Sequence, residues 1–141
     1  MNTYKKQIKQ IFDQNRIIVC PAFPNEEIVL NSKGFHHIFY KGGIKKFARS
    51  EKESAVRASL VPRAIKVLKF QCFVQEESLL DLGNKKIKFW AFEAVVDNRR
   101  IKVIVRQIND GKKHFWSVIP AWRRIRGKVV NSKSDLNSLA A

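Results

Sequence analysis

Residues 86–120 read KIKFWAFEAVVDNRRIKVIVRQINDGKKHFWSVIP. Apolar and polar residues alternate through much of this stretch, and a two-residue period is typical of β-strands with one buried face. Two breaks, at residues 97–98 and 109–111, carry the Asn, Asp and Gly that tight hairpin turns favour. The pattern therefore predicts a three-stranded antiparallel meander. The side chains expected to face its core are Trp90, Phe92, Ala94, Val96, Ile101, Val103, Val105, Phe115 and Ile119.

The opposite face of this meander is expected to be open to a ligand. A three-residue hairpin turn would place Arg106 directly across from His114, and Ile104 across from Trp116. Cations neutralise phosphates and an exposed aromatic ring stacks on a base, so this face suits single-stranded nucleic acid. Alternatively, Glu93 and Arg106 form a solvated cross-strand pair and Trp116 covers the sheet beneath another segment. The set expected on this face is Glu93, Lys102, Ile104, Arg106, His114, Trp116 and Val118.

Two of the segments that precede the meander have longer helical patterns. Residues 2–14 place apolar side chains at i, i+4, i+7 and i+8, which is typical of an amphipathic helix. Further along, Ser50 and Glu53 form a capping-box pattern ahead of a second apolar stripe. Pro62 lies within that stripe and is expected to break or restart the helix, because proline lacks the N–H that a helix interior uses.

A short helix with two histidines is predicted over residues 33–41. A polar residue at 31–32 can cap its start, and the two glycines at 42–43 can end it. At about 100° per residue, His36 and His37 fall off the apolar stripe and are expected to face away from the packing surface. The apolar stripe itself consists of Phe35, Ile38 and Phe39.

Helices followed by a meander predict an α+β fold, with N-terminal helices packed on a C-terminal antiparallel sheet. Short β-rich runs at residues 16–20 and 27–30 lie next to prolines, so they are expected to be edge strands or extended arms. Residues 1–126 are predicted to form one basic domain. Residues 127–141 are polar and small, and a flexible tail is expected there.

The charge of the chain is strongly one-sided. Its 141 residues include 28 Lys and Arg against 12 Asp and Glu, which gives a formal net charge of +16. Such an excess points to a polyanionic partner. No apolar run approaches the roughly 20 residues that a helix needs to span a bilayer. We therefore expect a cytoplasmic protein that does not bind a membrane. Cys20 and Cys72 stand far apart, which predicts reduced, buried thiols rather than a zinc cluster or a disulfide framework.

His36 and His37 are the most suggestive pair outside the meander. An outward-facing histidine can transfer protons near neutrality, although a merely solvated histidine is the plainer interpretation. No metal-ligand spacing accompanies the pair, and no nucleotide-cofactor or esterase motif occurs in the chain. We therefore expect neither a metal nor a cofactor.

The order of these parts resembles a known superfamily. The run IVLNSKGFHHI at residues 28–38 combines a short strand with a His-bearing helix, and a helical region with Arg57 and Pro62 follows. A basic meander comes next and ends in FWSVIP at residues 115–120. Together these parts resemble the barnase/EndoU/colicin/RelE-like (BECR) ribonucleases, particularly those of phages and mobile elements. The similarity spans about residues 28–122.

This resemblance implies metal-independent RNA cleavage. A base takes the 2′-hydroxyl proton, the 2′-oxygen attacks the phosphate, a cation stabilises the charge that develops, and an acid protonates the leaving 5′-oxygen. His37 or His36 would match the helix histidine, Arg106 or Lys102 the strand cation, and Ser117 the hydroxyl of the last strand. Simple alternation puts Ser117 with the core-facing set, so either the strand is bulged, or Ser117 is structural, or the cleft lies on the helix side. The rival acid/base pair on the open face is His114 and Glu93.

The function expected from these features is that of a toxin-like ribonuclease. The residues expected to contact RNA are Lys41, Lys102, Trp116, Arg123 and Arg124. An enzyme that cuts host RNA is lethal alone, so an acidic antidote or immunity protein is the expected protein partner. The alternative is an RNA-binding regulator or ribosome-associated module without chemistry. A weaker possibility is a structural or partner-binding phage protein.

Overall fold

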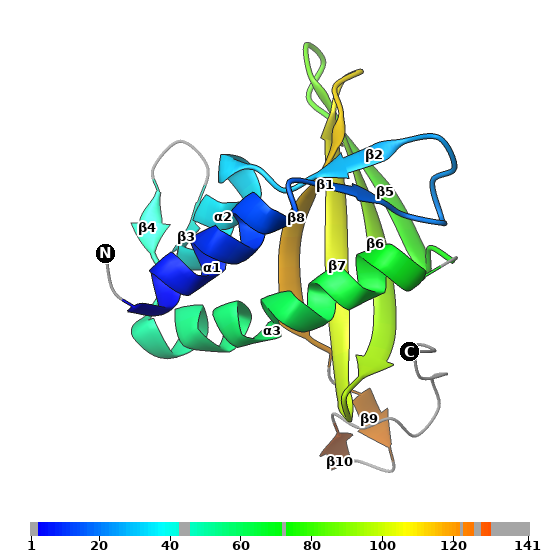
Figure 1. Cartoon of the computed structure of the whole chain (residues 1–141). Helices are drawn as coiled ribbons and strands as arrows, with labels where there is room; N and C mark the ends of the chain where they lie inside the picture. The colour runs from blue at the N-terminus through cyan, green and yellow to red at the C-terminus, as the bar shows by residue number, and fades with distance from the viewer. Residues whose placement is uncertain (1–2, 43–45, 72, 122, 126–127, 131–141) are drawn as a thin grey trace.

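The computed structural model describes residues 3–42, 46–71, 73–121, 123–125 and 128–130. These residues form an α+β fold, as the sequence predicts, in which helices lie against a six-stranded mixed sheet (Figure 1). The helices are α1 (Thr3–Gln14), α2 (Ser32–Phe39) and α3 (Glu51–Phe70). The strands of the sheet are β1 (Ile17–Val19), β2 (Glu27–Val29), β5 (Glu76–Asp81), β6 (Lys86–Val96), β7 (Arg99–Ile108) and β8 (Lys113–Pro120). Two short antiparallel pairs lie outside the sheet: β3 (Tyr40–Lys41) with β4 (Phe47–Ala48), and β9 (Arg123–Ile125) with β10 (Lys128–Val130).

The predicted meander is confirmed as β6, β7 and β8, each antiparallel to the next. Asp97 and Asn98 join β6 to β7 with φ values of 50° and 64°. Positive φ at both positions is what a two-residue type I′ hairpin requires. The sheet order is β1-β2-β8-β7-β6-β5. The edge strand β5 was not predicted, and all of its residues are exposed, so no buried face marks it in the sequence.

The two short N-terminal strands extend the sheet beyond β8. β1 lies at the edge, as expected, but β2 is interior, between β1 and β8. β2 runs parallel to β8 and pairs with it only at Ile28–Lys113 and Val29–His114. From Phe115 onward, therefore, β2 no longer pairs with β8. Helices α2 and α3 also contact β8.

The core lies between the sheet and the helices, and α3 crosses the sheet in front of β6 and β7 in the view of Figure 1. The predicted inward set is confirmed on β6 and β7. On β8, Phe115 is buried as expected, but Val118 occupies the core in place of Ile119. The core residues contributed by the meander are Trp90, Phe92, Ala94, Val96, Ile101, Val103, Val105, Phe115 and Val118.

A β-bulge in β8 explains this difference. Val105 pairs with Phe115 and Ile104 pairs with Ser117, so Trp116 is an extra residue without its own partner. The expected pairing of Ile104 with Trp116 was therefore wrong, whereas the pairing of Arg106 with His114 is confirmed. An inserted residue shifts the alternation by one position. Ser117 consequently leaves the core-facing set of the simple alternation and lies opposite Ile104.

Helix α3 runs without interruption through Pro62, contrary to the prediction. Pro62 itself is exposed, while Leu60, Val61 and Ala64 around it are fully buried. This burial offsets the loss of one backbone hydrogen bond, because most helical stability in proteins comes from packing an apolar face. The predicted cap is confirmed, since the Glu53 N–H donates to the Ser50 hydroxyl over 3.1 Å.

Helix α2 is shorter than predicted. Asn31 caps it by accepting a hydrogen bond from the Lys33 N–H, but the helix ends at Phe39, before the glycines. Tyr40 and Lys41 adopt extended geometry because they pair with β4. Phe35, Ile38 and Phe39 pack toward the core, as expected.

The structure also bears on the predictions for the C-terminal residues, the two cysteines and a membrane span. β10 lies inside the predicted tail, while residues 131–141 lie outside the described part of the chain. Cys20 is buried, as predicted, and its thiol donates to the Gln71 carbonyl at 3.7 Å. Cys72 lies outside the described residues. Among the helices described, none combines the length and apolar character needed to cross a bilayer.

Gly34 is where α2 approaches β8 most closely, and Gly34→Ala is expected to destabilise the protein. A Cβ at this position would overlap the backbone carbonyl of Phe115, which cannot move without distorting the sheet. Overpacking of this kind costs about 1–3 kcal/mol. Urea unfolding measures the loss. Ser32→Ala on the exposed start of α2 is the control, and equal stability of the two variants would contradict the close approach.

Candidate functional site

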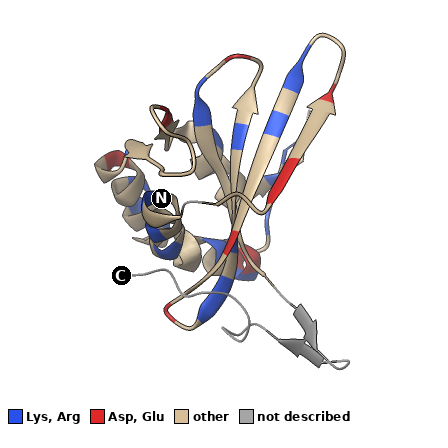
Figure 2. Ribbon diagram, turned by 90° about the vertical axis from the view of Figure 1, so that its right-hand side faces the viewer, with Lys and Arg blue, Asp and Glu red and all other residues tan. Residues whose placement is uncertain are grey.

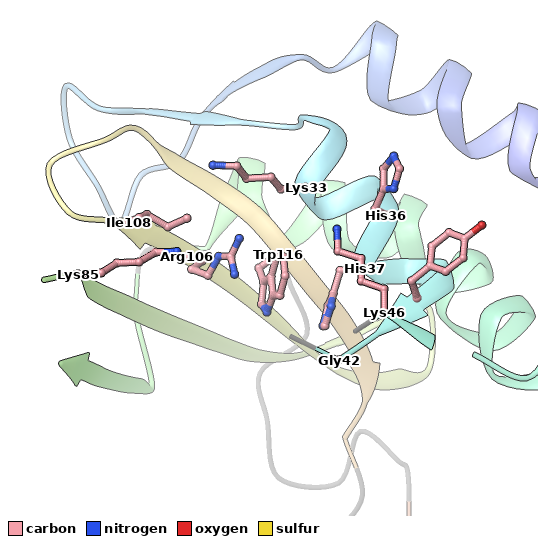
Figure 3. A pocket seen from close by; sticks show the side chains of 10 residues that line it. Lys33, His36, His37, Gly42, Lys46, Lys85, Arg106, Ile108 and Trp116 are labelled. Atoms are coloured by element: carbon pink, nitrogen blue, oxygen red, sulfur yellow. The ribbon is translucent and has the colours of Figure 1, made fainter. Parts of the chain in front are cut away.

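The bulge in β8 places an indole between two cationic or titratable side chains. The imidazole of His37, on α2, stacks on Trp116 with ring centroids 3.9 Å apart and an interplanar angle of 16°. The guanidinium carbon of Arg106, on β7, lies 3.4 Å from the centroid of the Trp116 ring. Trp116 lies between the two side chains (Figure 3). Both faces of the indole are thus covered, so Trp116 orients His37 and Arg106 instead of offering a free face to a base.

Arg106 also connects this stack to His114 on β8. Its Nε–H donates to His114 Nε2 over 3.0 Å, in the cross-strand pair that the sequence predicts. A guanidinium can only donate, so Nε2 of His114 acts as acceptor and carries no proton. His114 is only 3% exposed. Its buried, hydrogen-bonded position indicates that it holds Arg106 in place.

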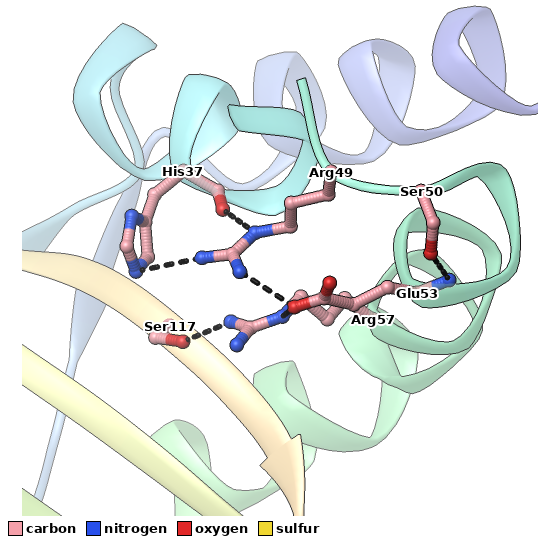
Figure 4. Close-up of polar contacts among 6 residues, drawn as sticks. All are labelled: His37, Arg49, Ser50, Glu53, Arg57 and Ser117. Atoms are coloured by element: carbon pink, nitrogen blue, oxygen red, sulfur yellow. Dashed lines mark hydrogen bonds and ion pairs between the residues drawn. The ribbon is translucent and has the colours of Figure 1, made fainter. Parts of the chain in front are cut away.

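On its other side, His37 contacts a polar cluster at the start of α3 (Figure 4). Arg49 donates from Nε to the His37 carbonyl over 2.9 Å, and its Nη2 lies 3.3 Å from His37 Nε2. By the same reasoning, His37 Nε2 is an unprotonated acceptor. Arg49 thus fixes both the backbone and the ring of the histidine. His37 was expected to face away from the packing surface, and that was wrong: it is half-buried between Trp116 and Arg49.

The same cluster holds the hydroxyl of Ser117. Arg57 Nη1 donates to Ser117 Oγ over 2.8 Å. Glu53 lies between the two arginines, 2.6 Å from Arg49 Nη1 and 3.6 Å from Arg57 Nε. One carboxylate therefore faces two guanidinium groups, and the cluster keeps a net positive charge. A histidine, a hydroxyl and two arginines converge here from α2, β8 and α3.

The electrostatics of the site keep both of its histidines neutral. Burial, followed by the charges of Arg49, Arg57 and Arg106, lowers the pKa of His37 from 6.5 to about 4. Burial, followed by the charges of Arg106 and Lys33, lowers the pKa of His114 from 6.5 to about 4. At neutral pH both imidazoles are therefore uncharged. The site is positive without protonated histidine, which favours an anionic ligand.

A cavity of about 460 Å³ opens beside the stack (Figure 3). His37, Arg106 and Trp116 form one wall of this cavity. Its other lining residues are Lys33, His36, Tyr40, Gly42, Lys46, Lys85 and Ile108. We refer to it below as the basic cavity, since none of the described residues that line it is an aspartate or a glutamate.

The structure brings together part of the predicted site. His37, Arg106, His114, Trp116 and Ser117 form one connected set. His36 is exposed, lines the basic cavity and has ring contacts with Phe35 and Tyr40.

The remaining predicted residues lie apart from this set. Glu93 pairs in register with Lys102, and its carboxylate lies 3.8 Å from Arg100. Lys102 itself binds Glu76 over 2.9 Å. Lys41 is exposed on β3. Arg123 and Arg124 belong to β9, and their side chains lie outside the described part of the structure.

Sequence reasoning missed three residues of the polar cluster. Glu53 and Arg57 lie one turn apart in α3, and Arg49 lies just before the helix, where it pairs with Glu53. That spacing was visible, but it is also typical of an ordinary solvated helix face. What distinguishes it is the contact with His37 and Ser117, which only the folded chain reveals.

Two further searches bear on the site. In the described part of the chain, no group of three or more His, Cys, Asp and Glu side chains is arranged to hold a metal ion. Comparisons with protein-family models, curated proteins and solved structures found no match to the chain. The chemistry of the side chains is therefore the basis for a functional proposal.

The lowered histidine pKa values predict that the free energy of unfolding decreases as the pH is lowered below 7. An unfolded histidine binds its proton near pH 6.5, whereas folded His114 binds it near pH 4. The stabilising contribution is thus complete above pH 6.5 and is lost as pH falls toward 4. For His114 the loss is on the order of 2–3 kcal/mol. Urea unfolding at pH 7 and pH 4.5 measures it, and His114→Gln is expected to lose less stability between these pH values; an equal loss would contradict the prediction.

Proposed function

We propose that this protein is an endoribonuclease that cleaves RNA through attack of a 2′-hydroxyl on the adjacent phosphate, as the resemblance to BECR ribonucleases implies. The observation that carries the proposal is the contact set of His37. A neutral imidazole whose Nε2 faces Arg49 is linked, through Glu53 and Arg57, to the hydroxyl of Ser117 (Figure 4). Proton acceptor, hydroxyl and cations are the groups that this reaction requires.

In the proposed reaction, Arg49 Nη2 moves from His37 Nε2 to the phosphate, and the Nε2 lone pair that this frees takes the proton of the 2′-hydroxyl. The 2′-oxygen forms a bond to phosphorus, and the bond from phosphorus to the 5′-oxygen breaks. Arg49 and Arg57 stabilise the negative charge on the non-bridging oxygens, and Ser117 donates a hydrogen bond to one of them. Protonated His37 then returns its proton to the departing 5′-oxygen. The products are a 2′,3′-cyclic phosphate and a 5′-hydroxyl, and no metal ion enters these steps.

The decisive experiment is incubation of the purified protein with total RNA and defined oligoribonucleotides in EDTA. We expect cleavage into fragments with 2′,3′-cyclic phosphate ends, while the corresponding DNA stays intact because it lacks the attacking hydroxyl. Intact RNA at high protein concentration would contradict the proposal. If RNA is bound but not cut, the protein is a binding module instead.

The pH dependence of cleavage offers a separate prediction. The profile of kcat/KM reports the pKa of groups in the free enzyme. Because His37 has a pKa of about 4, activity is expected to fall only below about pH 4 to 5, far under the usual histidine value of 6.5. Arg49→Gln removes one cause of the lowered pKa of His37, so the loss of activity at acidic pH should begin at a higher pH in this variant. A wild-type limb near 6.5 would argue against His37 as the base.

A protein partner would follow from this activity. The net charge of +16 and the cationic site suit an acidic protein that covers the basic cavity and blocks RNA. Such an antidote or immunity protein would protect the cell that makes the nuclease.

A further inference from the structure

The basic cavity gathers several cations around one opening. Lysine and arginine occur on helices and strands alike (Figure 2), so the net charge alone does not locate a ligand. Some lysines elsewhere in the described residues form ion pairs, including Lys66 with Asp97 and Lys112 with Glu27. The lysines that line the cavity, Lys33, Lys46 and Lys85, form no ion pair with any described residue.

The cavity meets the proposed active site at His37, the one proposed catalytic residue that lines it. Its wall of His37, Trp116 and Arg106 includes the proposed base itself. A chain whose phosphate lies at His37 therefore has its neighbouring nucleotides directly beside the cavity. Three lysines and Arg106 around the opening match the repeated negative charge of a sugar-phosphate backbone.

The shape and the aromatic residues favour a single strand. A volume of about 460 Å³ is in the range of pockets that hold small ligands. It suits one or two unpaired nucleotides better than a duplex, whose bases are hidden in the stack. Tyr40 also lines the cavity and is 36% exposed, with Lys5 Nζ 5.5 Å and the His36 ring centroid 6.1 Å from the centroid of its ring. An exposed aromatic face can stack an unpaired base, and both faces of Trp116 are already occupied.

We propose that the basic cavity is a subsite for single-stranded RNA that flanks the cleaved phosphate, with Lys33, Lys46 and Lys85 on the backbone and Tyr40 against a base. This rests on the proposed function. The enzyme thus requires more than the two nucleotides that flank the cleaved bond, and it cleaves unpaired segments.

Binding of a hexameric 2′-O-methyl RNA tests the subsite without cleavage, because a methylated 2′-oxygen cannot attack. The variant Lys33→Ala/Lys85→Ala is expected to weaken binding at least tenfold, measured by fluorescence anisotropy. The control Lys66→Ala/Lys112→Ala removes the same charge at exposed, ion-paired positions and should weaken binding no more than twofold. Tyr40→Ala should weaken binding roughly tenfold, as expected for loss of one stacked base. Equal losses in the two double variants would overturn the subsite.

Cleavage kinetics separate the subsite from the proposed reaction. With unmodified RNA, kcat/KM should be at least tenfold higher for a hexamer than for a dinucleotide, and a hexamer duplex should resist cleavage. The variant Lys33→Ala/Lys85→Ala should reduce the ratio of kcat/KM for the hexamer to kcat/KM for the dinucleotide. If RNA is cut but hexamer and dinucleotide react equally, the subsite fails while the nuclease stands. If the methylated hexamer binds at these lysines but no RNA is cut, the nuclease fails while the binding site stands.

Discussion

His37→Ala is expected to lower kcat for RNA cleavage about a thousandfold. A positioned general base contributes roughly 10²- to 10⁴-fold to a reaction rate. Among the described side chains of this site, only His37 contacts both Arg49 and Trp116. Single-turnover cleavage of a defined oligoribonucleotide measures the effect on the chemical step.

Two further variants show whether proton transfer is the property that matters. His37→Asn keeps a planar polar group beside Trp116 but cannot take up a proton at neutral pH, so it should be nearly as inactive as His37→Ala. His36→Ala, at the adjacent exposed position, should retain most of kcat, with any effect confined to KM. If His37→Asn cleaves at the wild-type rate, His37 is a structural residue. Thermal melting of each variant guards against a simple loss of fold.

Arg57→Ala is expected to lower kcat roughly 100- to 1000-fold. Preorganised charge directed at the developing oxyanion is usually a large contribution to catalysis, and removing one donor costs on this order. Arg57 has two roles in the site, since it holds Ser117 Oγ over 2.8 Å and faces Glu53. Arg57→Lys keeps the charge but loses the planar fork of donors, so it should recover only part of the rate. The rate of the chemical step under saturating enzyme is the measurement.

Arg63→Ala is the matched control for this prediction. Arg63 lies on the same helix but donates to the Val96 carbonyl, away from His37. Its loss should lower stability with little change in kcat. A double-mutant cycle of Arg57→Ala with Ser117→Ala is a second check. Because Arg57 acts partly through Ser117, the double variant should lose less activity than the product of the two single effects. Fully independent effects would contradict the coupling.

The sequence predicted the meander and the helices because their periods are local. Alternation in residues 86–105 assigned every core position correctly, and Ser50 with Glu53 marked the start of α3. The pairing of β2 with β8 joins residues far apart in the chain, and no local pattern encodes it. Pro62 was misread because packing on both sides of it overrides its local preference.

The site was predicted less completely than the fold. Arg106 and His114 were paired correctly because a short turn fixes their register. Past that pair, the bulge could not be recognised, since Val118 and Ile119 are both apolar and either one could face the core. The face assigned to Ser117 depended on that choice. Arg49 and Arg57 resemble ordinary helix charges until α2 is placed beside them.

The parallel pairing of β2 with β8 also bears on when the protein can become active during its synthesis. The ribosome makes His37 well before the strand that carries Trp116 and Ser117. Until Lys113 and His114 can join β2, the imidazole has neither its stacking partner nor its neighbouring hydroxyl. The proposed nuclease can therefore cleave RNA only after β8 has been made and has joined β2.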